Sequence, residues 1–255
     1  MGVLDNRHAL ITGGGTGIGA AIARALAGEG AAVSLAGRRQ APLENVAASL
    51  AKATAIVADV TKESDCAAMA RAACEAHGPI DIVVANAGTA ASAAVEKMEL
   101  SHWQSIIDVN LTGAFLTVKA ALPDVTRKFE GTRRIVFIAS TAGLKGYPYV
   151  AAYCAAKHGV VGLTRALSLE LESTGVTVNA VCPGYTDTPL IDAAAGKISA
   201  KTGRSANEAR AMLAKDNPSG RLVKPEEVAL AVLRLCLPSA GSVNGQTIEV
   251  TGGSQ

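Results

Sequence analysis

A tyrosine and a lysine, Tyr153 and Lys157, lie four positions apart in a stretch whose apolar residues recur at helical spacing. Side chains four positions apart share one face of a helix, so the phenol and the ammonium group would lie close together. An adjacent positive charge favours the phenolate, and we therefore expect the pKa of Tyr153 to fall below its ordinary value of about 10. Such a pair could exchange a proton with a substrate oxygen near neutral pH.

Two other polar residues stand where chemistry is possible. Ser140 follows residues 134–139, an apolar run that predicts a strand, and ligands of open α/β sheets bind beyond the carboxyl ends of strands. Its hydroxyl could hydrogen-bond a substrate oxygen on which charge develops. Asn110 lies within a long apolar helical stretch, where a buried amide must be hydrogen-bonded. For either residue taken alone, a structural role is the simpler interpretation.

Glycines gather near the start of the chain, in residues 12–19, between a predicted strand and an apolar helix. Glycine permits positive φ angles and lets the backbone approach a pyrophosphate, which the N–H groups and dipole of the helix N-terminus then stabilise. A glycine-rich turn alone is weak evidence, but this one has the strand in front and the helix behind that a dinucleotide site requires. The residues predicted to form that site are Gly13, Gly15, Thr16, Gly17, Ile18 and Gly19.

The end of the second predicted strand indicates which dinucleotide binds. NAD sites place a carboxylate there, which accepts a hydrogen bond from the ribose 2′-hydroxyl, whereas NADP needs a cation. This chain has Arg38 and Arg39 and no carboxylate at that point. Because a guanidinium binds phosphate through paired, charge-assisted hydrogen bonds, we predict NADP(H) as the cofactor. The alternative is that both arginines are merely solvated loop charges.

The elements that must position these residues alternate along the chain. Short apolar runs bounded by turn residues predict strands at 9–12, 32–36, 55–58, 80–85, 134–139, 176–181 and 247–250. Helical spacing predicts helices at 18–28, 43–51, 64–77, 101–122, 151–173 and 225–236. This alternation predicts an α/β fold in one domain, residues 1–255: a single doubly wound, Rossmann-type parallel sheet of about seven strands with helices on both faces.

Residues 187–221 break the alternation, since they contain no strand candidate. An insertion beyond a strand end is a typical place for a lid over a ligand cleft, and we expect a substrate lid here. Within residues 190–221 three acidic residues (Asp192, Glu208, Asp216) stand against six basic ones (Lys197, Lys201, Arg204, Arg210, Lys215, Arg221). A positive lid could attract a phosphorylated carrier such as coenzyme A, although for the charges alone a solvated helix face is the better explanation.

Composition excludes several classes of protein. The formal net charge of +2 is too small for a nucleic-acid-binding surface. The five cysteines are scattered, without a C-x-x-C pair, so we expect neither a disulfide framework nor a metal site. No secretion signal, myristoylation motif or apolar run of about 18 uncharged residues is evident, and we expect a cytoplasmic protein without a membrane partner.

Together these residues resemble the short-chain dehydrogenase/reductase family, in its compact branch, over essentially the whole chain. The T-G-x-x-x-G-x-G motif falls on Thr12, Gly13, Gly17 and Gly19, and the N-A-G motif on Asn86, Ala87 and Gly88. The catalytic Asn, Ser, Tyr and Lys of the family fall on Asn110, Ser140, Tyr153 and Lys157. Two positions depart from the family pattern: Thr16 replaces a basic residue of many NADP-preferring members, and Thr251 replaces a common aspartate.

The resemblance implies a role for each matched residue. Tyr153 would be the general acid in reduction and the general base in oxidation. Lys157 would tune Tyr153 and hold the nicotinamide ribose, Ser140 would orient the substrate oxygen, and Asn110 would support a water-mediated proton relay. Further expected cofactor contacts are adenine contacts at Asp59 and Val60, the cleft residues Asn86, Ala87 and Gly88, and the nicotinamide segment with Pro183, Gly184, Thr186 and Thr188. The family is usually tetrameric, so a homotetramer is expected.

The expected activity is the NADP(H)-dependent interconversion of a secondary alcohol and a ketone by hydride transfer. Residues 156–164 and 181–184 are similar to those of 3-oxoacyl-thioester and polyketide ketoreductases, which favours a 3-oxoacyl thioester as substrate, with coenzyme A as a possible carrier. A sugar, a steroid or a cyclic ketone remains an alternative. A protein that only senses the cofactor is a remote alternative, because such proteins typically lose the tyrosine or the lysine.

Overall fold

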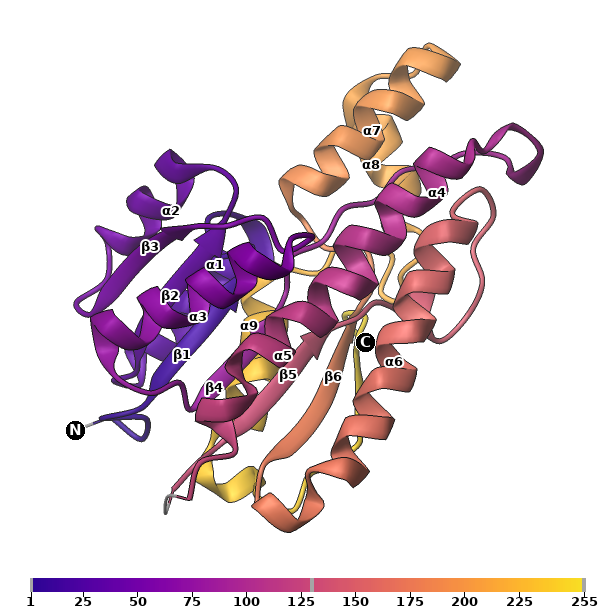
Figure 1. The fold of residues 1–255 in the computed structure, drawn as a ribbon. Helices are drawn as coiled ribbons and strands as arrows, with labels where there is room; N and C mark the ends of the chain where they lie inside the picture. Colours follow the sequence, from indigo (N-terminus) through magenta and orange to yellow (C-terminus); the bar gives the residue numbers. More distant parts are fainter. Residues whose placement is uncertain (1, 129–130, 254–255) are drawn as a thin grey trace.

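The computed structural model describes residues 2–128 and 131–253, and these contain one parallel sheet of seven strands (Figure 1). Across the sheet the order is β3-β2-β1-β4-β5-β6-β7. The strands are β1 (His8–Thr12), β2 (Ala32–Gly37), β3 (Ala53–Val57), β4 (Ile82–Ala85), β5 (Arg134–Ile138), β6 (Thr177–Pro183) and β7 (Thr247–Val250). The chain passes from β3 back to the centre at β4, so the sheet is doubly wound, as predicted.

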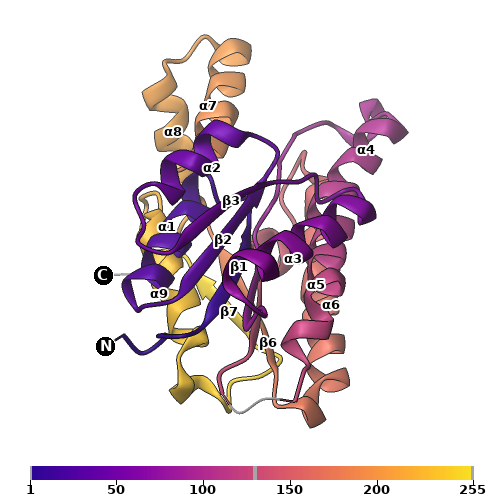
Figure 2. The ribbon, with the colours of Figure 1, turned by 60° about the vertical axis from the view of Figure 1, so that its left-hand side comes forward.

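Helices cover both faces of the sheet, which confirms the predicted layers (Figure 2). The helices are α1 (Gly17–Gly28), α2 (Gln40–Ala47), α3 (Glu63–His77), α4 (Leu100–Ile107), α5 (Gly113–Val125), α6 (Ala151–Glu170), α7 (Pro189–Thr202), α8 (Ala206–Ala214) and α9 (Pro225–Cys236). Buried residues of α1, α2 and α9 share one apolar cluster, and those of α3, α5 and α6 share another. The two clusters lie on opposite faces of the sheet.

Successive strand residues divide between these two clusters. In β1, Leu10 belongs to the cluster under α3, α5 and α6, whereas Ile11 belongs to the cluster under α1, α2 and α9. The alternation follows from the pleat, which turns successive side chains to opposite faces. Since both faces are covered, all five residues of β1 and of β5 are buried. This explains why such strands read in the sequence as continuous apolar runs rather than alternating ones.

The single helix expected at residues 101–122 is wrong in detail. The structure has α4, then a π-helical turn at Asp108–Thr112, then α5. From this turn the side-chain amide of Asn110 donates a hydrogen bond to the carbonyl of Ile106 in α4, at 2.9 Å. A π-turn inserts an extra residue into the helical ladder and re-aims the side chains that follow, often beside a functional site.

The described residues contain one helical run, Leu100–Val125, that by length and composition could cross a membrane. It carries Asp108, Lys119 and Asp124. Its α5 part supplies buried residues to the cluster on the sheet, among them Val118 and Ala121. This is the place of a core helix in a doubly wound fold.

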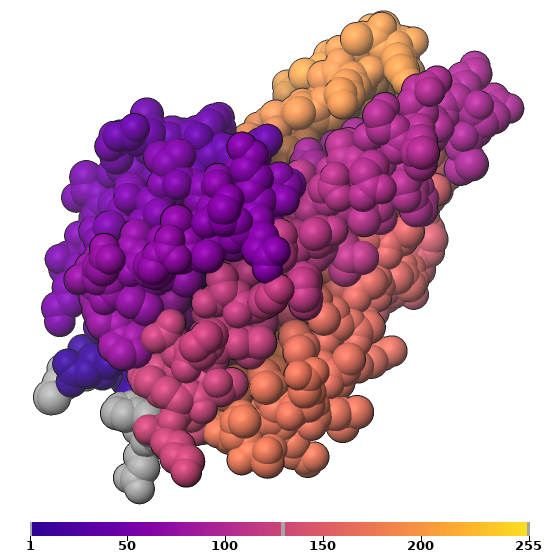
Figure 3. Space-filling model, in the orientation of Figure 1, coloured from indigo at the N-terminus to yellow at the C-terminus, as the bar shows by residue number. Residues whose placement is uncertain are grey.

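Helices α7 and α8 lie within the region where no strand was expected, and they form a hairpin. Figure 1 shows the hairpin projecting beyond the carboxyl ends of the strands, and Figure 3 shows it standing out from the body of the molecule. A capping box begins α8, where Ser205 and Glu208 satisfy each other's backbone N–H groups. The chain segments before and after the hairpin are joined by an isolated parallel bridge between Thr186 and Val223.

Candidate active site

A cavity of about 960 Å³ opens at the carboxyl ends of the central strands, beneath α7. It brings together most of the residues predicted from the sequence, which come from five separate parts of the chain. These are Gly13, Thr16, Gly17, Ile18, Gly19, Asn86, Ala87, Gly88, Ser140, Tyr153, Lys157, Pro183, Gly184, Thr186 and Thr188. The expectation that a ligand site lies beyond the strand ends is consistent with this placement.

The remaining predicted residues lie outside this cavity. Gly15, Arg38 and Arg39 line a small adjoining pocket of about 80 Å³, which shares Gly13 and Thr16 with the large cavity. Asp59 and Val60 follow β3 and line neither pocket. A carboxylate oxygen of Asp59 instead accepts hydrogen bonds from the backbone N–H and the hydroxyl of Thr61, at 3.1 and 2.8 Å.

Asn86 holds the glycine turn against the end of β4. Its side-chain amide donates hydrogen bonds to the carbonyls of Thr12, at 2.8 Å, and Gly13, at 3.3 Å. A Cβ atom at Gly19 would lie 2.2 Å from the carbonyl oxygen of Gly13 and 2.6 Å from Nδ2 of Asn86. Only glycine permits this close approach, which leaves the start of α1 facing the cavity. The turn therefore fits the pyrophosphate of a dinucleotide, held by backbone N–H groups.

The turn that carries Ser140 lies directly on α6. Ser140 caps a short 3₁₀ helix, Thr141–Gly143, by accepting a hydrogen bond from the N–H of Ala142 at 3.1 Å. A Cβ atom at Gly143 would lie 2.6 Å from the carbonyl oxygen of Lys157. The absence of a side chain at Gly143 thus lets the end of β5 reach the helix that bears the tyrosine and the lysine.

Tyr153 and Lys157 lie one turn apart near the start of α6, as their spacing predicts. The ammonium nitrogen of Lys157 lies 5.7 Å from the centre of the Tyr153 ring and donates a hydrogen bond to the carbonyl of Ile138 at 2.7 Å. Lys157 is buried and Tyr153 is partly buried. The lysine is therefore anchored to the end of β5 rather than exposed beside the phenol.

Burial controls the acidity of both groups. It raises the pKa of Tyr153 to about 12, which a hydrogen bond with Ser140 opposes, and it lowers the pKa of Lys157 to about 8. The expectation that Lys157 would bring the pKa of Tyr153 below its ordinary value is wrong in this structure, because desolvation by burial is the largest cause of the shift and raises the pKa. The phenol is consequently protonated at neutral pH and able to donate a proton.

Asn110 is buried behind the cavity wall and does not line the cavity. Its amide donates to the carbonyl of Thr89 at 2.8 Å, and its side-chain oxygen accepts from the N–H of Thr89 at 3.2 Å. A Cβ atom at Gly88 would lie 2.9 Å from that oxygen and 3.8 Å from the ammonium nitrogen of Lys157. Asn110 thus joins the π-turn to the loop after β4, with Gly88 between it and the lysine.

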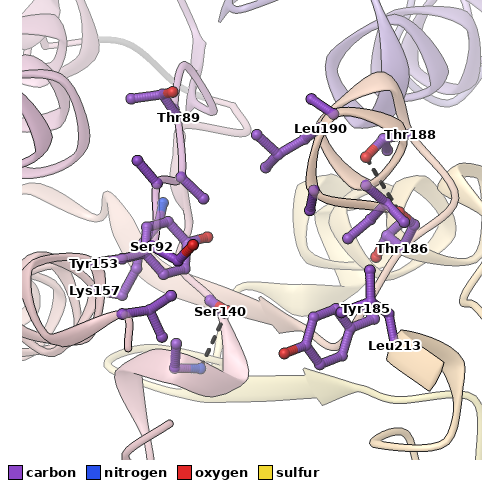
Figure 4. A pocket seen from close by; sticks show the side chains of 18 of the residues that line it. Thr89, Ser92, Ser140, Tyr153, Lys157, Tyr185, Thr186, Thr188, Leu190 and Leu213 are labelled. Atoms are coloured by element: carbon purple, nitrogen blue, oxygen red, sulfur yellow. Dashed lines mark hydrogen bonds between the residues drawn. The ribbon is translucent and has the colours of Figure 1, made fainter. Parts of the chain in front are cut away.

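The second wall of the cavity combines the predicted contacts Thr186 and Thr188 and the predicted lid with one residue that was not predicted, Tyr185. Figure 4 shows Tyr185, Thr186, Thr188, Leu190 and Leu213 facing the wall that holds Tyr153 and Lys157, with Ser140 between the two walls. The ring of Tyr185 packs edge-on against Tyr147, with 6.1 Å between the ring centres. Nothing in the local pattern distinguishes Tyr185, since only the path of the chain after β6 turns it toward the cavity.

Comparisons with known proteins agree with this geometry. Residues 7–197 match the family described as short chain dehydrogenase. D-beta-hydroxybutyrate dehydrogenase of Cupriavidus necator is 38% identical, covering 98% of this chain and 98% of that protein. 2-(S)-hydroxypropyl-CoM dehydrogenase 3 of Xanthobacter autotrophicus is 40% identical, covering 98% of this chain and 97% of that protein. The crystal structure of a point variant of actinorhodin polyketide ketoreductase with NADPH has a TM-score of 0.92 at 39% identity, covering 99% of this chain and 98% of that one.

The family resemblance inferred from the sequence is therefore confirmed, including the similarity to polyketide ketoreductases. The matched segment contains the glycine turn and the Tyr153 and Lys157 pair, and the relatives extend over nearly the whole chain. This chain belongs to the short-chain dehydrogenase family and is an oxidoreductase that acts on an alcohol or a ketone.

Proposed function

We propose that the protein uses NADP(H) to interconvert a secondary alcohol and a ketone, with Tyr153 exchanging the proton of the substrate oxygen. The observation that carries this proposal is that one cavity is lined by Tyr153, Lys157 and Ser140 and also by the glycine turn. A substrate oxygen beside the phenol would therefore lie in the same space as the reactive end of a dinucleotide held by the turn. The bound dinucleotide supplies or accepts the hydride.

The protein's own groups supply the proton and the positioning. In reduction, the protonated Tyr153 donates its proton to the substrate oxygen, and in oxidation the phenolate takes the proton back. The Ser140 hydroxyl donates a hydrogen bond to the same oxygen and stabilises its developing charge. Lys157, anchored on Ile138 at 2.7 Å, keeps a positive charge beside the phenolate. Asn110 positions the loop that contains Gly88.

The choice of NADP(H) rests on the small pocket at the edge of the glycine turn. Arg38 and Arg39 line this pocket together with Gly15 and Thr16, and no carboxylate lines it among the described residues. Both arginines are exposed, and neither guanidinium forms an ion pair within the described chain. The carboxylate of Asp59 interacts electrostatically with Arg38, but a 2′-phosphate would give both guanidinium groups a directly bound anion, which a ribose hydroxyl cannot do. The polyketide ketoreductase of similar fold was crystallised with NADPH.

We assign residues 187–221, with the α7 and α8 hairpin, as the substrate lid of a single domain, because α7 lines the cavity along much of its length. The substrate we favour is a 3-oxoacyl or 3-hydroxyacyl thioester. The similarity to a polyketide ketoreductase and to a hydroxybutyrate dehydrogenase supports a substrate with a second oxygen function two carbons from the reacting carbon.

The Tyr153→Phe variant tests the proton-transfer role. NADPH oxidation is measured with acetoacetyl-CoA, a neutral ketone, a sugar and a steroid as oxidants. We expect the wild type to reduce at least one of them, and the variant to lose about 10²- to 10⁴-fold in kcat, because general acid catalysis contributes that much. The Kd for NADPH and the melting temperature serve as controls, and both should be the same in the variant as in the wild type. Unchanged turnover in the variant contradicts the proposal.

A further inference from the structure

The charged side chains that line the cavity are all positive among the described residues. Among the described residues that line it, four are lysines and none is an aspartate or glutamate. Lys157 is buried and bound to Ile138, but Lys97, Lys197 and Lys201 are exposed. Neither an ion pair nor a side-chain hydrogen bond engages these three ammonium groups within residues 2–128 and 131–253. They are thus available to a ligand in the cavity.

The three lysines converge from two parts of the fold. Lys197 and Lys201 lie one turn apart on α7, so they share one face of the helix. Lys97 ends a short 3₁₀ helix, Val95–Lys97, in the segment between β4 and α4. Figure 1 shows that α7 and the beginning of α4 both project beyond the strand ends. The lysines therefore border the outer part of the cavity.

The two lysines on α7, Lys197 and Lys201, lie far from the glycine turn. The methyl carbon of Thr188, which precedes α7, would lie 3.1 Å from a Cβ atom at Gly17, so the helix begins at the turn. With a rise of 1.5 Å per residue, Lys197 and Lys201 lie about 13 Å and about 20 Å further along the helix axis. A pyrophosphate held at the turn is too far away to be their partner.

Several other charged residues of the lid form ion pairs, so the excess of basic over acidic residues is not spread evenly over the lid. Arg210 forms ion pairs with Asp187 and Asp192, and Arg221 forms an ion pair with Glu227 at 2.7 Å. Arg204 and Lys215 do not line the cavity. Among the cations of the lid that form no ion pair within the described residues, Lys197 and Lys201 on α7 therefore border the cavity.

We propose that Lys97, Lys197 and Lys201 form a binding subsite for an anionic group of the substrate, a carboxylate or phosphate remote from the reacting carbon. The inference deepens the proposed function and rests on it. Clustered cations in a cleft raise the local concentration of an anion and speed its association, with a strong dependence on salt. The subsite would select anionic ketones over neutral ones of the same reactivity.

Matched substrates test this directly. Acetoacetyl-CoA is compared with acetoacetyl-N-acetylcysteamine, which has the same thioester without phosphates, and acetoacetate with its neutral ethyl ester. Values of kcat/KM are measured by NADPH oxidation at low and high salt. We expect the wild type to prefer at least one anionic member roughly 10-fold or more at low salt, and to lose much of this preference at high salt. The pair that shows the preference identifies phosphate or carboxylate as the anion.

The variant Lys97→Gln, Lys197→Gln, Lys201→Gln should abolish the preference while leaving the neutral substrates and the Kd for NADPH unchanged. Lys215→Gln is the matched control, since it removes a lysine at the end of α8 that does not line the cavity. Equal use of both members of each pair by the wild type overturns the proposal. So does a triple variant that weakens NADPH binding or lowers neutral and anionic turnover alike.

A direct binding measurement separates failure of this inference from failure of the proposed function. Calorimetric titration of acetoacetyl-CoA and acetoacetate into the protein with NADP⁺, which cannot reduce a ketone, compares binding to the wild type with binding to the triple variant. If no ketone is reduced, the proposed function fails, yet binding that depends on the three lysines still supports the subsite. Binding of both anions that is equal in the two proteins refutes the subsite whether or not turnover occurs.

Discussion

The ammonium nitrogen of Lys157 donates a hydrogen bond to the main-chain carbonyl of Ile138 at 2.7 Å. This contact joins α6 to the last residue of β5, two positions before Ser140. A buried cation is thereby held at a single place by the backbone of the strand that supplies the neighbouring serine. The ammonium group of Lys157 is thus held beside Tyr153, where the proposed reaction requires it, but burying the charge lowers the stability of the folded state.

Replacement of Lys157 by methionine should raise stability near neutral pH while removing activity. Burial lowers the pKa of Lys157 from 10.5 to about 8, so the folded state binds the proton less tightly than the unfolded chain. The resulting cost, about 3 kcal/mol, is fully present below pH 8 and is relieved as pH rises toward 10.5. Methionine fills the site without charge.

Urea unfolding at pH 7 and pH 9.5 measures this effect. The wild type should gain stability between the two values relative to the Lys157→Met variant. The measurement stops below pH 10. Above that value the raised pKa of Tyr153, about 12, makes the folded state less stable as pH rises, which opposes the effect of Lys157. A variant that is less stable than the wild type at pH 7, with the same pH dependence, would contradict the account.

Removal of Arg38 and Arg39 should change cofactor selectivity. The double variant Arg38→Ala, Arg39→Ala deletes the two cations of the small pocket, and we expect the Kd for NADPH to rise about 10- to 100-fold, since a hydrogen bond to a charged group contributes about 1.5–3 kcal/mol. The Kd for NADH should stay within about twofold. Fluorescence titration of both cofactors measures the change, and Arg24→Ala, at an exposed position on α1, is the control. Wild type that binds NADH as tightly as NADPH would refute the assignment.

Two glycines at opposite ends of α1 should respond differently to alanine. A Cβ atom at Gly19 would lie 2.2 Å from the Gly13 carbonyl oxygen, whereas a Cβ atom at Gly28 would meet nothing within 4 Å. Gly19→Ala should destabilise the protein by about 1–3 kcal/mol through overpacking and weaken NADPH binding. Gly28→Ala should be neutral or stabilise by up to about 1 kcal/mol. Thermal unfolding and NADPH titration of the pair provide the test, and similar behaviour of both variants would argue against a tight turn.

His8 should make the fold sensitive to acid. Its ring nitrogens contact the carbonyl of Gly78 at 2.8 Å and the hydroxyl of Ser34 at 2.9 Å, and the His77 ring lies edge-on at 5.3 Å. Burial lowers the pKa of His8, which the Gly78 carbonyl and the Asp81 carboxylate oppose, and burial also lowers the pKa of His77.

Because the folded pKa values lie below the unfolded value of 6.5, stability is retained above pH 6.5 and falls as pH decreases below it. His8→Gln, which keeps a side chain able to donate and accept hydrogen bonds, should show a flatter dependence of the unfolding free energy between pH 7 and pH 5. An equally steep loss in the variant would assign the acid sensitivity to other groups.

Much of this protein was determined by its sequence because the governing patterns are local. Apolar runs and helical spacing depend on neighbouring residues, so the alternation of strands and helices, and from it the doubly wound sheet, followed without coordinates. The glycine turn and the spacing of Tyr153 and Lys157 are local as well. The rule that ligands lie beyond the strand ends was sufficient to predict that Ser140 and the turn would share a site.

Only the tertiary structure decided what depends on residues distant in the chain. The π-turn around Asn110 is accompanied by hydrogen bonds to Thr89, 21 positions earlier, which no helical pattern reveals. The pKa of Tyr153 is raised mainly by desolvation, which depends on the groups that exclude water from the phenol and is not visible in the spacing of Tyr153 and Lys157. Ion pairing was likewise decided by the tertiary structure. Asp187 and Asp192 pair with Arg210 of α8, and Lys197 and Lys201 of α7 form no ion pair within the described residues. Burial and ion pairing are properties of the packed chain, and a linear sequence contains them only implicitly.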